Sequence, residues 1–322
     1  MFKEIPIILS SDKILDKAFK STKKVQIVDR DAFYKKKKTI IAKTESFAMT
    51  VVSTLENYVK KFPSINNLST FYQEIIDIKI DVDKLRKSLG AVDWARKTCQ
   101  SIYSIQNKQL RKTKDINFLA SKQQEIYGRI SSVVKQIRKE LDFLEKAQRI
   151  MRKLPDIFDI PTVVIAGYPN VGKSSLLRCI SKAKPAIAQY PFTTKEIFVG
   201  HIEKKNKYKT LRFQVIDTPG LLDRPFEKRN EIEKQAIAAL RHLADVIVFV
   251  IDPSQTCGYS IDDQKNLLKQ LKKMFTSSKF IIVENKSDVI NTRTKNIKIS
   301  CQTNEGISPL CDKIFSYYKE KE

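Results

Sequence analysis

The sequence is poor in glycine, histidine and tryptophan, and it lacks any long apolar run. Its 322 residues include 8 glycines, 2 histidines and 1 tryptophan. Because no stretch of about 18 or more uncharged apolar residues occurs, we expect no membrane-spanning segment and no membrane partner. The apolar stretch near the N-terminus is too short for a signal peptide.

Cysteine is also scarce, and its distribution argues against structural bridges. The 5 cysteines are Cys99, Cys179, Cys257, Cys301 and Cys311. Their number is odd, no CxxC pair occurs, and two histidines leave little material for a zinc site. We therefore expect neither a disulfide framework nor a zinc centre, and a reducing cytoplasm as the location.

Acidic residues are few relative to basic ones. Lysine and arginine total 60 against 36 aspartates and glutamates, which gives a net charge of +24. Such a field favours polyanions, and the commonest polyanion in a cytoplasm is nucleic acid. The charge therefore indicates RNA as a partner, although a lysine-rich composition can also serve solubility alone. Each basic cluster by itself is more simply a solvated helix face, and the clusters are Lys35–Lys38, Lys60–Lys61, Arg111/Lys112/Lys114, Arg138/Lys139 and Arg152/Lys153.

Glycine usage divides the chain into two halves with different patterns. Residues 1–160 contain Gly90 and Gly128, and the other glycines follow. In the first half, apolar residues recur at intervals of three and four, as in Phe47, Val51 and Leu55. This spacing predicts a bundle of several long helices.

Three segments set the details of this predicted bundle. Residues 133–151 fit one continuous helix face. Residues 75–85 alternate like a strand, but a helical face covers a longer part of them, so we predict a helix. Pro63 is expected to end another helix, with turn residues after it.

The second half has the pattern of an α/β domain. Short, apolar, β-branched segments occur at 160–167, 210–218, 245–252 and 279–285. Amphipathic helical stretches separate them, which predicts a doubly wound, mostly parallel sheet covered on both faces. The predicted domains are a basic helical bundle over 1–157 and an α/β domain over 158–322.

The segment GYPNVGKS, residues 167–174, matches the phosphate-binding pattern GxxxxGK[ST] between a predicted strand and a predicted helix. Gly167 and Gly172 permit a tight turn whose backbone N–H groups point at phosphates. Lys173 is predicted to reach the β- and γ-phosphates, and the Ser174 hydroxyl to bind Mg²⁺. The remaining predicted nucleotide contacts of this loop are Tyr168, Pro169, Asn170, Val171 and Ser175.

The segment DTPG ends the predicted strand 210–218. Asp217 can hold Mg²⁺ through water, and Gly220 can turn its N–H toward a γ-phosphate. Thr218, Pro219 and Leu221 belong to the same predicted loop. Alone, DTPG is a common β-turn, but its place after the phosphate loop favours the nucleotide role.

The segment NKSD, residues 285–288, follows a strand and predicts guanine specificity. Asp288 can accept hydrogen bonds from the guanine N1–H and exocyclic amine, which adenine does not offer in that arrangement. Asn285 is expected to steady the loop and the Lys286 stem to cover the base, with Ser287 between them. The backbone at Ser300–Cys301 is predicted to reach guanine O6.

One further element lies between the phosphate loop and the DTPG segment. A threonine in YPFTTKEIFVG, residues 190–200, can coordinate Mg²⁺ when a γ-phosphate is present. Thr194 is the predicted ligand, with Thr193 as the alternative. Either threonine can instead be the start of a strand.

These motifs closely resemble the Obg-like branch of translation-factor-related GTPases, and within it the Nog-type nucleolar GTP-binding proteins in a minimal, archaeal-like form. GYPNVGKSSLL, YPFTTKEIFVGH, VIDTPGLLDRP and NKSD carry the match over 167–288, and AVDWARKTC at 91–99 is similar too. The resemblance implies a helical bundle fused to a P-loop GTPase domain. It further implies a role in assembly of the large ribosomal subunit through pre-ribosomal RNA.

Two positions bear on the rate of hydrolysis. Leu221 stands where many GTPases place a glutamine that orients the attacking water, so we expect slow intrinsic turnover. Asn170 resembles the asparagine that coordinates K⁺ in some relatives without that glutamine. The other interpretation is that Asn170 only caps the loop.

We therefore predict a cytoplasmic, slowly hydrolysing GTP switch that uses GTP/GDP, Mg²⁺ and, in one reading, K⁺. Lys173, Thr194 and Gly220 take the catalytic roles; the predicted partners are ribosomal RNA and precursors of the large subunit, and a monomer is favoured. One alternative is an RNA- or ribosome-binding module with GTP as a structural ligand. Another is a tRNA- or translation-associated Obg-like GTPase; Asp288 opposes an ATPase.

Overall fold

The computed structural model shows two compact units within one chain. The structure describes residues 2–154, 156–181, 185–189, 196–205, 210–225 and 231–319. The first unit comprises residues 1–67 and 79–152, and the second comprises 68–78 and 153–322. Residues 68–78 therefore join the C-terminal half, while the domain limits 1–157 and 158–322 stay a prediction.

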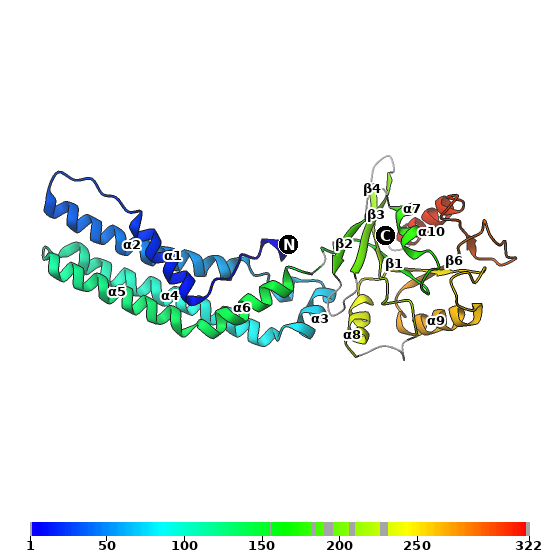
Figure 1. The fold of residues 1–322 in the computed structure, drawn as a ribbon, viewed down its shortest axis with the longest axis horizontal. Helices are drawn as coiled ribbons and strands as arrows, with labels where there is room; N and C mark the ends of the chain where they lie inside the picture. Colours follow the sequence, from blue (N-terminus) through cyan, green and yellow to red (C-terminus); the bar gives the residue numbers. More distant parts are fainter. Residues whose placement is uncertain are drawn as a thin grey trace. The chain divides into compact units, whose positions relative to one another are not determined.

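The first unit is helical, as the spacing of apolar residues predicts. Helices α1, α2, α4 and α5 lie side by side, and α6 packs against α4 (Figure 1). Phe47, Val51 and Leu55 are fully buried in α2. In the described part of the chain, no helix is both long and apolar enough to cross a membrane. The helical segments are η1 Phe2–Glu4, α1 Ser11–Lys23, α2 Ala32–Lys61, η2 Ile65–Asn67, α4 Val82–Lys112, α5 Ile116–Gln136 and α6 Arg138–Met151.

Two predicted helices are each interrupted in the structure. The segment 75–85 is helical on both sides of a break, because α3, Thr70–Lys79, ends before α4 begins at Val82. Asp81 makes this break, since its side chain accepts a hydrogen bond from the Lys84 N–H at 2.8 Å and caps α4. The segment 133–151 is divided at Ile137, between α5 and α6, although its apolar residues are buried as one face.

The second unit contains a mixed sheet, seven-stranded over the described residues. Its order is β2-β3-β4-β1-β5-β6-β7, with β4, β1, β5, β6 and β7 parallel and β2 and β3 antiparallel. The four predicted strands are confirmed as β1, β4, β5 and β6. Helices α7 and α10 lie on one face and α8 and α9 on the other (Figure 1). The bounds are β1 Thr162–Ala166, α7 Lys173–Ile180, β2 Ala186–Gln189, β3 Glu196–Lys205, β4 Thr210–Asp217, α8 Glu231–Leu240, β5 Val246–Ile251, α9 Ile261–Met274, β6 Lys279–Glu284, β7 Ile297–Lys298 and α10 Ile307–Lys319.

Helix α3, Thr70–Lys79, belongs to the second unit although it precedes most of the helices in sequence. The Tyr72 hydroxyl accepts a hydrogen bond from the Ile157 N–H at 2.7 Å and donates to the Ile157 carbonyl at 3.2 Å. Burial raises the pKa of Tyr72 to about 12. Glu74 Oε1 lies at hydrogen-bond distance, 2.8 Å, from His242 Nε2. These contacts fix α3 to the strand-bearing half.

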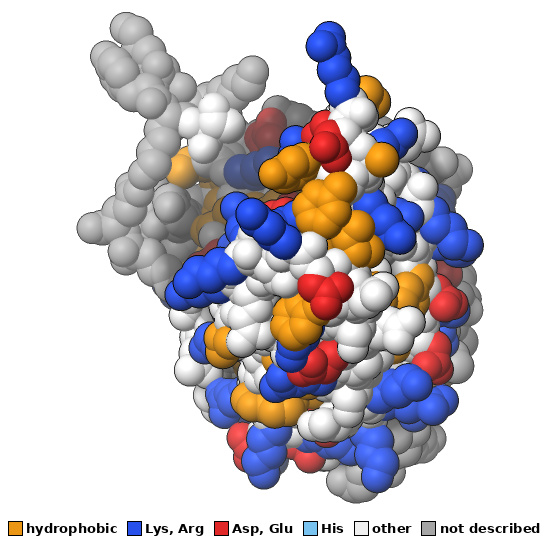
Figure 2. Space-filling model, turned by 90° about the vertical axis from the view of Figure 1, so that its left-hand side faces the viewer, with side chains coloured by type: hydrophobic (Ala, Val, Ile, Leu, Met, Phe, Trp, Pro, Cys, Tyr) orange, Lys and Arg blue, Asp and Glu red, His pale blue; other side chains and the backbone are white. Residues whose placement is uncertain are grey.

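The lysine run 35–38 lies at the start of α2 and divides into two pairs. Lys37 donates to the carbonyls of Arg111 and Thr113 at 2.9 and 2.7 Å, and so satisfies the end of α4. Lys38 pairs with Asp29 at 2.6 Å. Lys35 and Lys36 are exposed. Figure 2 views this end of the helical unit, where basic side chains are spread among smaller apolar groups.

We expect Lys37→Met to destabilise the helical unit by about 1 kcal/mol, because two carbonyl groups lose a charged donor. Lys36→Met removes the same charge from an exposed position and serves as the matched control. Urea unfolding can be followed through Trp94, the single tryptophan, which lies in α4. Equal midpoints for the two variants would show that the Lys37 hydrogen bonds do not stabilise the unit.

Candidate functional site

Four loops meet at one edge of the sheet, where parallel strands β1, β4, β5 and β6 end. They begin at Gly167, Thr218, Asp252 and Asn285. In open α/β sheets the carboxyl ends of the strands form the ligand-binding edge. Three of these loops hold the predicted phosphate, DTPG and NKSD motifs.

The phosphate loop needs its two glycines for both conformation and space. Gly167 has φ 142° and Gly172 has φ 100°, in the region that favours glycine. A Cβ on Gly167 would lie 2.5 Å from the Val250 carbonyl oxygen, and one on Gly172 would collide with the Asn285 side-chain nitrogen. Asn170 also has a positive φ, 61°, which asparagine tolerates better than most residues.

Lys173 begins α7 and is enclosed by the loop that precedes it. Its ammonium donates to the carbonyls of Gly167 and Tyr168 at 2.8 and 2.7 Å, and only 7% of the residue is exposed. Burial lowers its pKa, against the opposing effect of the Asp223 and Asp217 carboxylates. The Tyr168 ring packs on Tyr259 with centroids 4.2 Å apart, which covers this side of the loop.

Ser174 and Asp217 come together from α7 and the end of β4. The Ser174 hydroxyl donates to Asp217 Oδ2 at 2.6 Å. Asp217 is fully buried, and its Oδ1 has no hydrogen-bond partner among the described residues. Burial raises the pKa of Asp217, opposed by the Ser174 hydrogen bond. A buried carboxylate oxygen with nothing to satisfy it is suited to a cation or a water bound to one.

The DTPG loop is held by a carboxylate that the sequence reasoning did not identify. The Gly220 N–H, at φ 79°, donates to Asp223 Oδ2 at 2.7 Å. The Gly167 N–H donates to the Leu222 carbonyl at 3.2 Å, which joins this loop to the phosphate loop. Leu221 is fully buried. Asp223 lies in the matched segment VIDTPGLLDRP, but no role was predicted for it because it stands three positions beyond Gly220, outside the DTPG turn.

Asn285 connects three loops through one amide. Its Nδ2 donates to the Val171 carbonyl at 2.8 Å, and its Oδ1 accepts from the Cys301 N–H at 3.3 Å. Its backbone N–H donates to the Ile251 carbonyl at 2.9 Å, and the residue is 3% exposed. The NKSD segment is therefore fixed directly against the phosphate loop and the 300–301 loop.

Lys286 is held by Asp252, a second residue that the sequence reasoning missed. Lys286 has φ 64°, and its ammonium lies 2.5 Å from Asp252 Oδ2 and 2.6 Å from the Thr256 hydroxyl. Burial raises the pKa of Asp252, but hydrogen bonds from Lys286 and Ser254 outweigh this effect and leave the pKa below its ordinary value. The signal was available: an aspartate at the end of a buried strand, two residues before a serine, is typical of an Asx turn.

The remaining predicted base contacts surround Asn285. Asp288 is exposed, so its carboxylate is accessible to a ligand. Ser287 is half-buried, and its hydroxyl has no partner among the described residues. Ser300 is fully buried and accepts hydrogen bonds from the N–H groups of Gln302 and Thr303. The Cys301 carbonyl accepts from the Cys179 thiol at 3.5 Å, and burial raises the pKa of Cys301 to about 12.

The other predicted contacts divide between the phosphate loop and a segment that is not described. Pro169, Asn170, Val171 and Ser175 occupy the loop and the first turn of α7, and Thr218 and Pro219 follow β4. The predicted ligand Thr194 and its alternative Thr193 lie outside the described residues. In the described part of the chain, no three acidic, histidine or cysteine residues form a metal-binding group.

Comparison with known proteins assigns both units to one family. The NOG1 N-terminal helical domain matches residues 2–158, and Nucleolar GTP-binding protein 1 (NOG1) matches residues 231–288. Over 294 residues the chain is 38% identical to an uncharacterized protein of Methanocaldococcus jannaschii, covering 90% of this chain and 81% of that protein.

Longer relatives match over the same region. The chain is 33% identical over 299 residues to nucleolar GTP-binding protein 1 of Saccharomyces cerevisiae, covering 90% of this chain and 45% of that protein. It thus spans less than half the length of the yeast relative. A solved chain of nucleolar GTP-binding protein 1 from Plasmodium falciparum shares 34% identity with a TM-score of 0.44, covering 52% of this chain and 91% of that one. The helical unit, the mostly parallel sheet, the two family matches and the sequence relatives show that the chain has a P-loop GTPase fold and belongs to the nucleolar GTP-binding protein 1 family.

Proposed function

We propose that this protein binds GTP and GDP at the sheet edge and hydrolyses GTP slowly. The observation that carries the proposal is the Asn285 amide, which bonds both the Val171 carbonyl and the Cys301 N–H. This amide holds residues 285–288, which we propose recognise guanine, beside the phosphate loop, and this supports one ligand that occupies both. Asp288 then accepts from the guanine edge, and the Cys301 backbone approaches O6.

The phosphates bind over the amides of 167–174 and at the N-terminus of α7. Lys173 neutralises the β- and γ-phosphates after exchanging its carbonyl partners for phosphate oxygens. The Gly220 N–H donates to the γ-phosphate when it leaves Asp223. The proposed contacts to the γ-phosphate, from Lys173 and the Gly220 N–H, are the ones that distinguish GTP from GDP.

Mg²⁺ fits the pair formed by Ser174 and Asp217. The Asp217 Oδ1 is buried with no hydrogen-bond partner in the part of the chain that the structure describes, and both side chains offer the oxygen ligands that this ion prefers. Thr194 is the proposed further ligand. When bound, the ion neutralises charge that develops on the phosphates during hydrolysis.

Slow turnover follows from Leu221. Its side chain is fully buried and apolar, so it cannot orient the attacking water. This observation also favours the second candidate function, in which the nucleotide is mainly a structural ligand. Asn170 is exposed in the phosphate loop, and we propose it as a K⁺ ligand that compensates for the missing glutamine.

We further propose that the protein acts on ribosomal RNA during assembly of the large ribosomal subunit. The net charge of +24 supports a polyanionic partner, and the Saccharomyces cerevisiae relative is named nucleolar GTP-binding protein 1. The helical unit is the proposed RNA-binding part. A cytoplasmic location and a monomeric state remain predictions from the sequence.

Asp288→Asn should change the base that the site accepts. An amide offers one acceptor and one donor, which matches the N1–H and C2 carbonyl of xanthine but not the two donors of guanine. We expect the affinity of the variant for GDP to fall on the order of 100-fold relative to the wild type. The variant should then bind xanthosine diphosphate more tightly than GDP. Calorimetry with GDP, ADP and xanthosine diphosphate measures this, with the exposed Asp262→Asn as control. Equal affinities of the wild-type protein for GDP and ADP would contradict the proposed guanine recognition by Asp288.

Asp223→Ala should favour the triphosphate. The change frees the Gly220 N–H and removes a carboxylate near the phosphates, so we expect the ratio of GTP-analogue to GDP affinity to rise about tenfold. Asp223→Asn keeps an acceptor without the charge and should give a smaller rise. Competition binding with a non-hydrolysable GTP analogue measures both. A lower ratio in Asp223→Ala would mean that Asp223 positions the loop for GTP.

Replacing KCl by NaCl should slow multiple-turnover GTP hydrolysis if Asn170 holds K⁺. Asn170→Gly keeps the positive φ while removing the amide, so it should hydrolyse GTP equally slowly in both salts. Phosphate release is the measurement. Equal wild-type rates in the two salts would leave Asn170 with a conformational role only, and no turnover in either salt would favour the structural-ligand function.

A further inference from the structure

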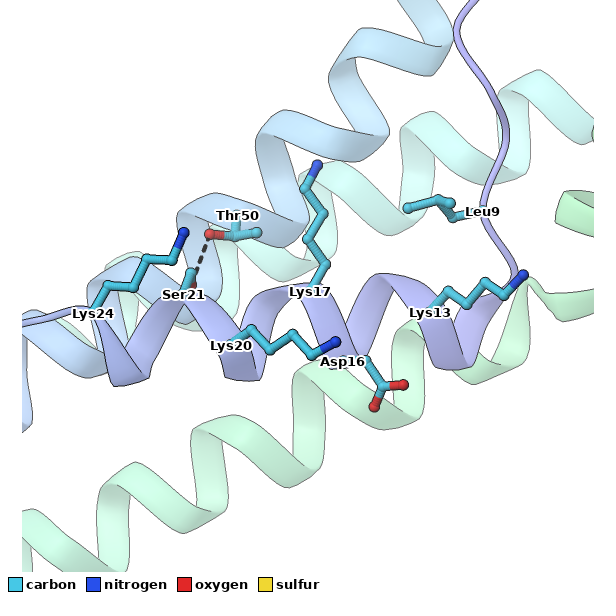
Figure 3. A pocket seen from close by; sticks show the side chains of 8 residues that line it. All are labelled: Leu9, Lys13, Asp16, Lys17, Lys20, Ser21, Lys24 and Thr50. Atoms are coloured by element: carbon cyan, nitrogen blue, oxygen red, sulfur yellow. Dashed lines mark hydrogen bonds between the residues drawn. The ribbon is translucent and has the colours of Figure 1, made fainter.

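A groove lies between α1 and α2 in the helical unit, remote in sequence from the nucleotide loops. Its volume is 590 Å³, and eight residues line it: Leu9, Lys13, Asp16, Lys17, Lys20, Ser21, Lys24 and Thr50 (Figure 3). Four of these are lysines and one is an aspartate, so the lining carries a net charge of +3. The volume is within the range of ligand sites in proteins, roughly 300–1,000 Å³.

The lysines follow one side of α1 at intervals of four, three and four residues. This spacing places about one ammonium at each helical turn, over roughly 16 Å between Lys13 and Lys24. Lys17 and Lys24 point toward α2, whereas Lys13 and Lys20 extend along α1 (Figure 3). Lys17 donates to the Thr54 hydroxyl at 3.2 Å. The four lysines therefore form a regular row of positive charges along the groove and are not scattered over the surface.

A network of hydroxyl groups fixes α1 against α2 beneath this row. The Thr50 and Ser46 hydroxyls both donate to Ser21 Oγ at 3.0 Å, and the Ser21 hydroxyl donates to the Ala18 carbonyl at 2.7 Å. Leu9 is tied nearby, because its N–H donates to the Tyr58 hydroxyl at 3.1 Å. The positions of the lysine backbones are therefore set before any ligand binds, which reduces the entropy lost on binding.

We propose that this groove binds the phosphodiester backbone of an RNA strand. A regular row of ammonium groups matches a regular row of phosphates, and each phosphate contact releases counterions. Leu9 and the aliphatic stems of the lysines form an apolar floor against which a sugar or base can lie. The inference rests on the proposed function, and it locates the RNA contact on α1 instead of on the lysine run at the start of α2, where Lys37 and Lys38 already have partners.

The test compares two triple variants of the full chain with the same change in charge. One replaces Lys13, Lys20 and Lys24 by glutamine and keeps Lys17, which bonds Thr54. The control replaces Lys87, Lys139 and Lys146, exposed on other helices. The probe is a fluorescein-labelled 20-nucleotide single-stranded RNA, measured by anisotropy between 50 and 300 mM KCl. Calorimetry with GDP is run on all three proteins.

We expect the groove variant to lose at least tenfold in affinity at 150 mM KCl, with the salt slope reduced by about 2. The control variant should lose much less. Equal losses in the two variants would overturn the groove, since only the general field would then matter. Tighter wild-type binding to a polyglutamate peptide than to RNA, lost in the groove variant, would assign the groove to an acidic protein instead. Failure of the wild type to bind GDP would refute the proposed function. If all three proteins bind GDP but the two triple variants bind RNA equally well, only the groove proposal is refuted.

Discussion

The arrangement of the loops at the carboxyl edge of the sheet depends on the close approach of the Asn285 side-chain amide to the backbone at residues 171–172. The Asn285 side chain reaches the Val171 carbonyl only because residue 172 has no Cβ, which would occupy the space of its nitrogen. Motifs separated by 114 positions are thus joined by a single buried hydrogen bond. Because this amide also binds the Cys301 N–H, three loops share one anchor and cannot shift independently.

Buried charges at this edge are only partly satisfied by the protein. Burial lowers the pKa of Lys173 and raises that of Asp217, so both charged forms are disfavoured by their surroundings. Asp252 differs, because Lys286 and Ser254 compensate for its burial. Under the proposed function, phosphates and Mg²⁺ supply the missing counter-charges for Lys173 and Asp217. Binding would then stabilise the folded unit as well as switch it.

The sequence predicted the strands and the motif positions because both depend on local patterns. Buried parallel strands read as β-branched runs, and the glycines of the phosphate loop are needed wherever such a loop occurs. Other features depend on packing. The break at Asp81 was missed because apolar spacing continued across it, and Asp223 because its partner is a backbone N–H. Thr194 stays a prediction, since it lies outside the described residues.

Because α3 belongs to the second unit, the sequence of the first unit is interrupted by residues 68–78. The backbone leaves the helical unit after residue 67, returns at 79 and leaves again after 152. A fragment that begins at residue 153, where the second stretch of this unit starts, would keep Ile157 but lack α3, and with it the Tyr72 hydroxyl that bonds the Ile157 backbone. Phe71, Ile75 and Ile76 of α3, which are buried in the whole chain, would also be absent from such a fragment. The two halves are therefore not separable by one cut, and a faithful isolated GTPase unit would have to carry residues 68–78 as an added segment.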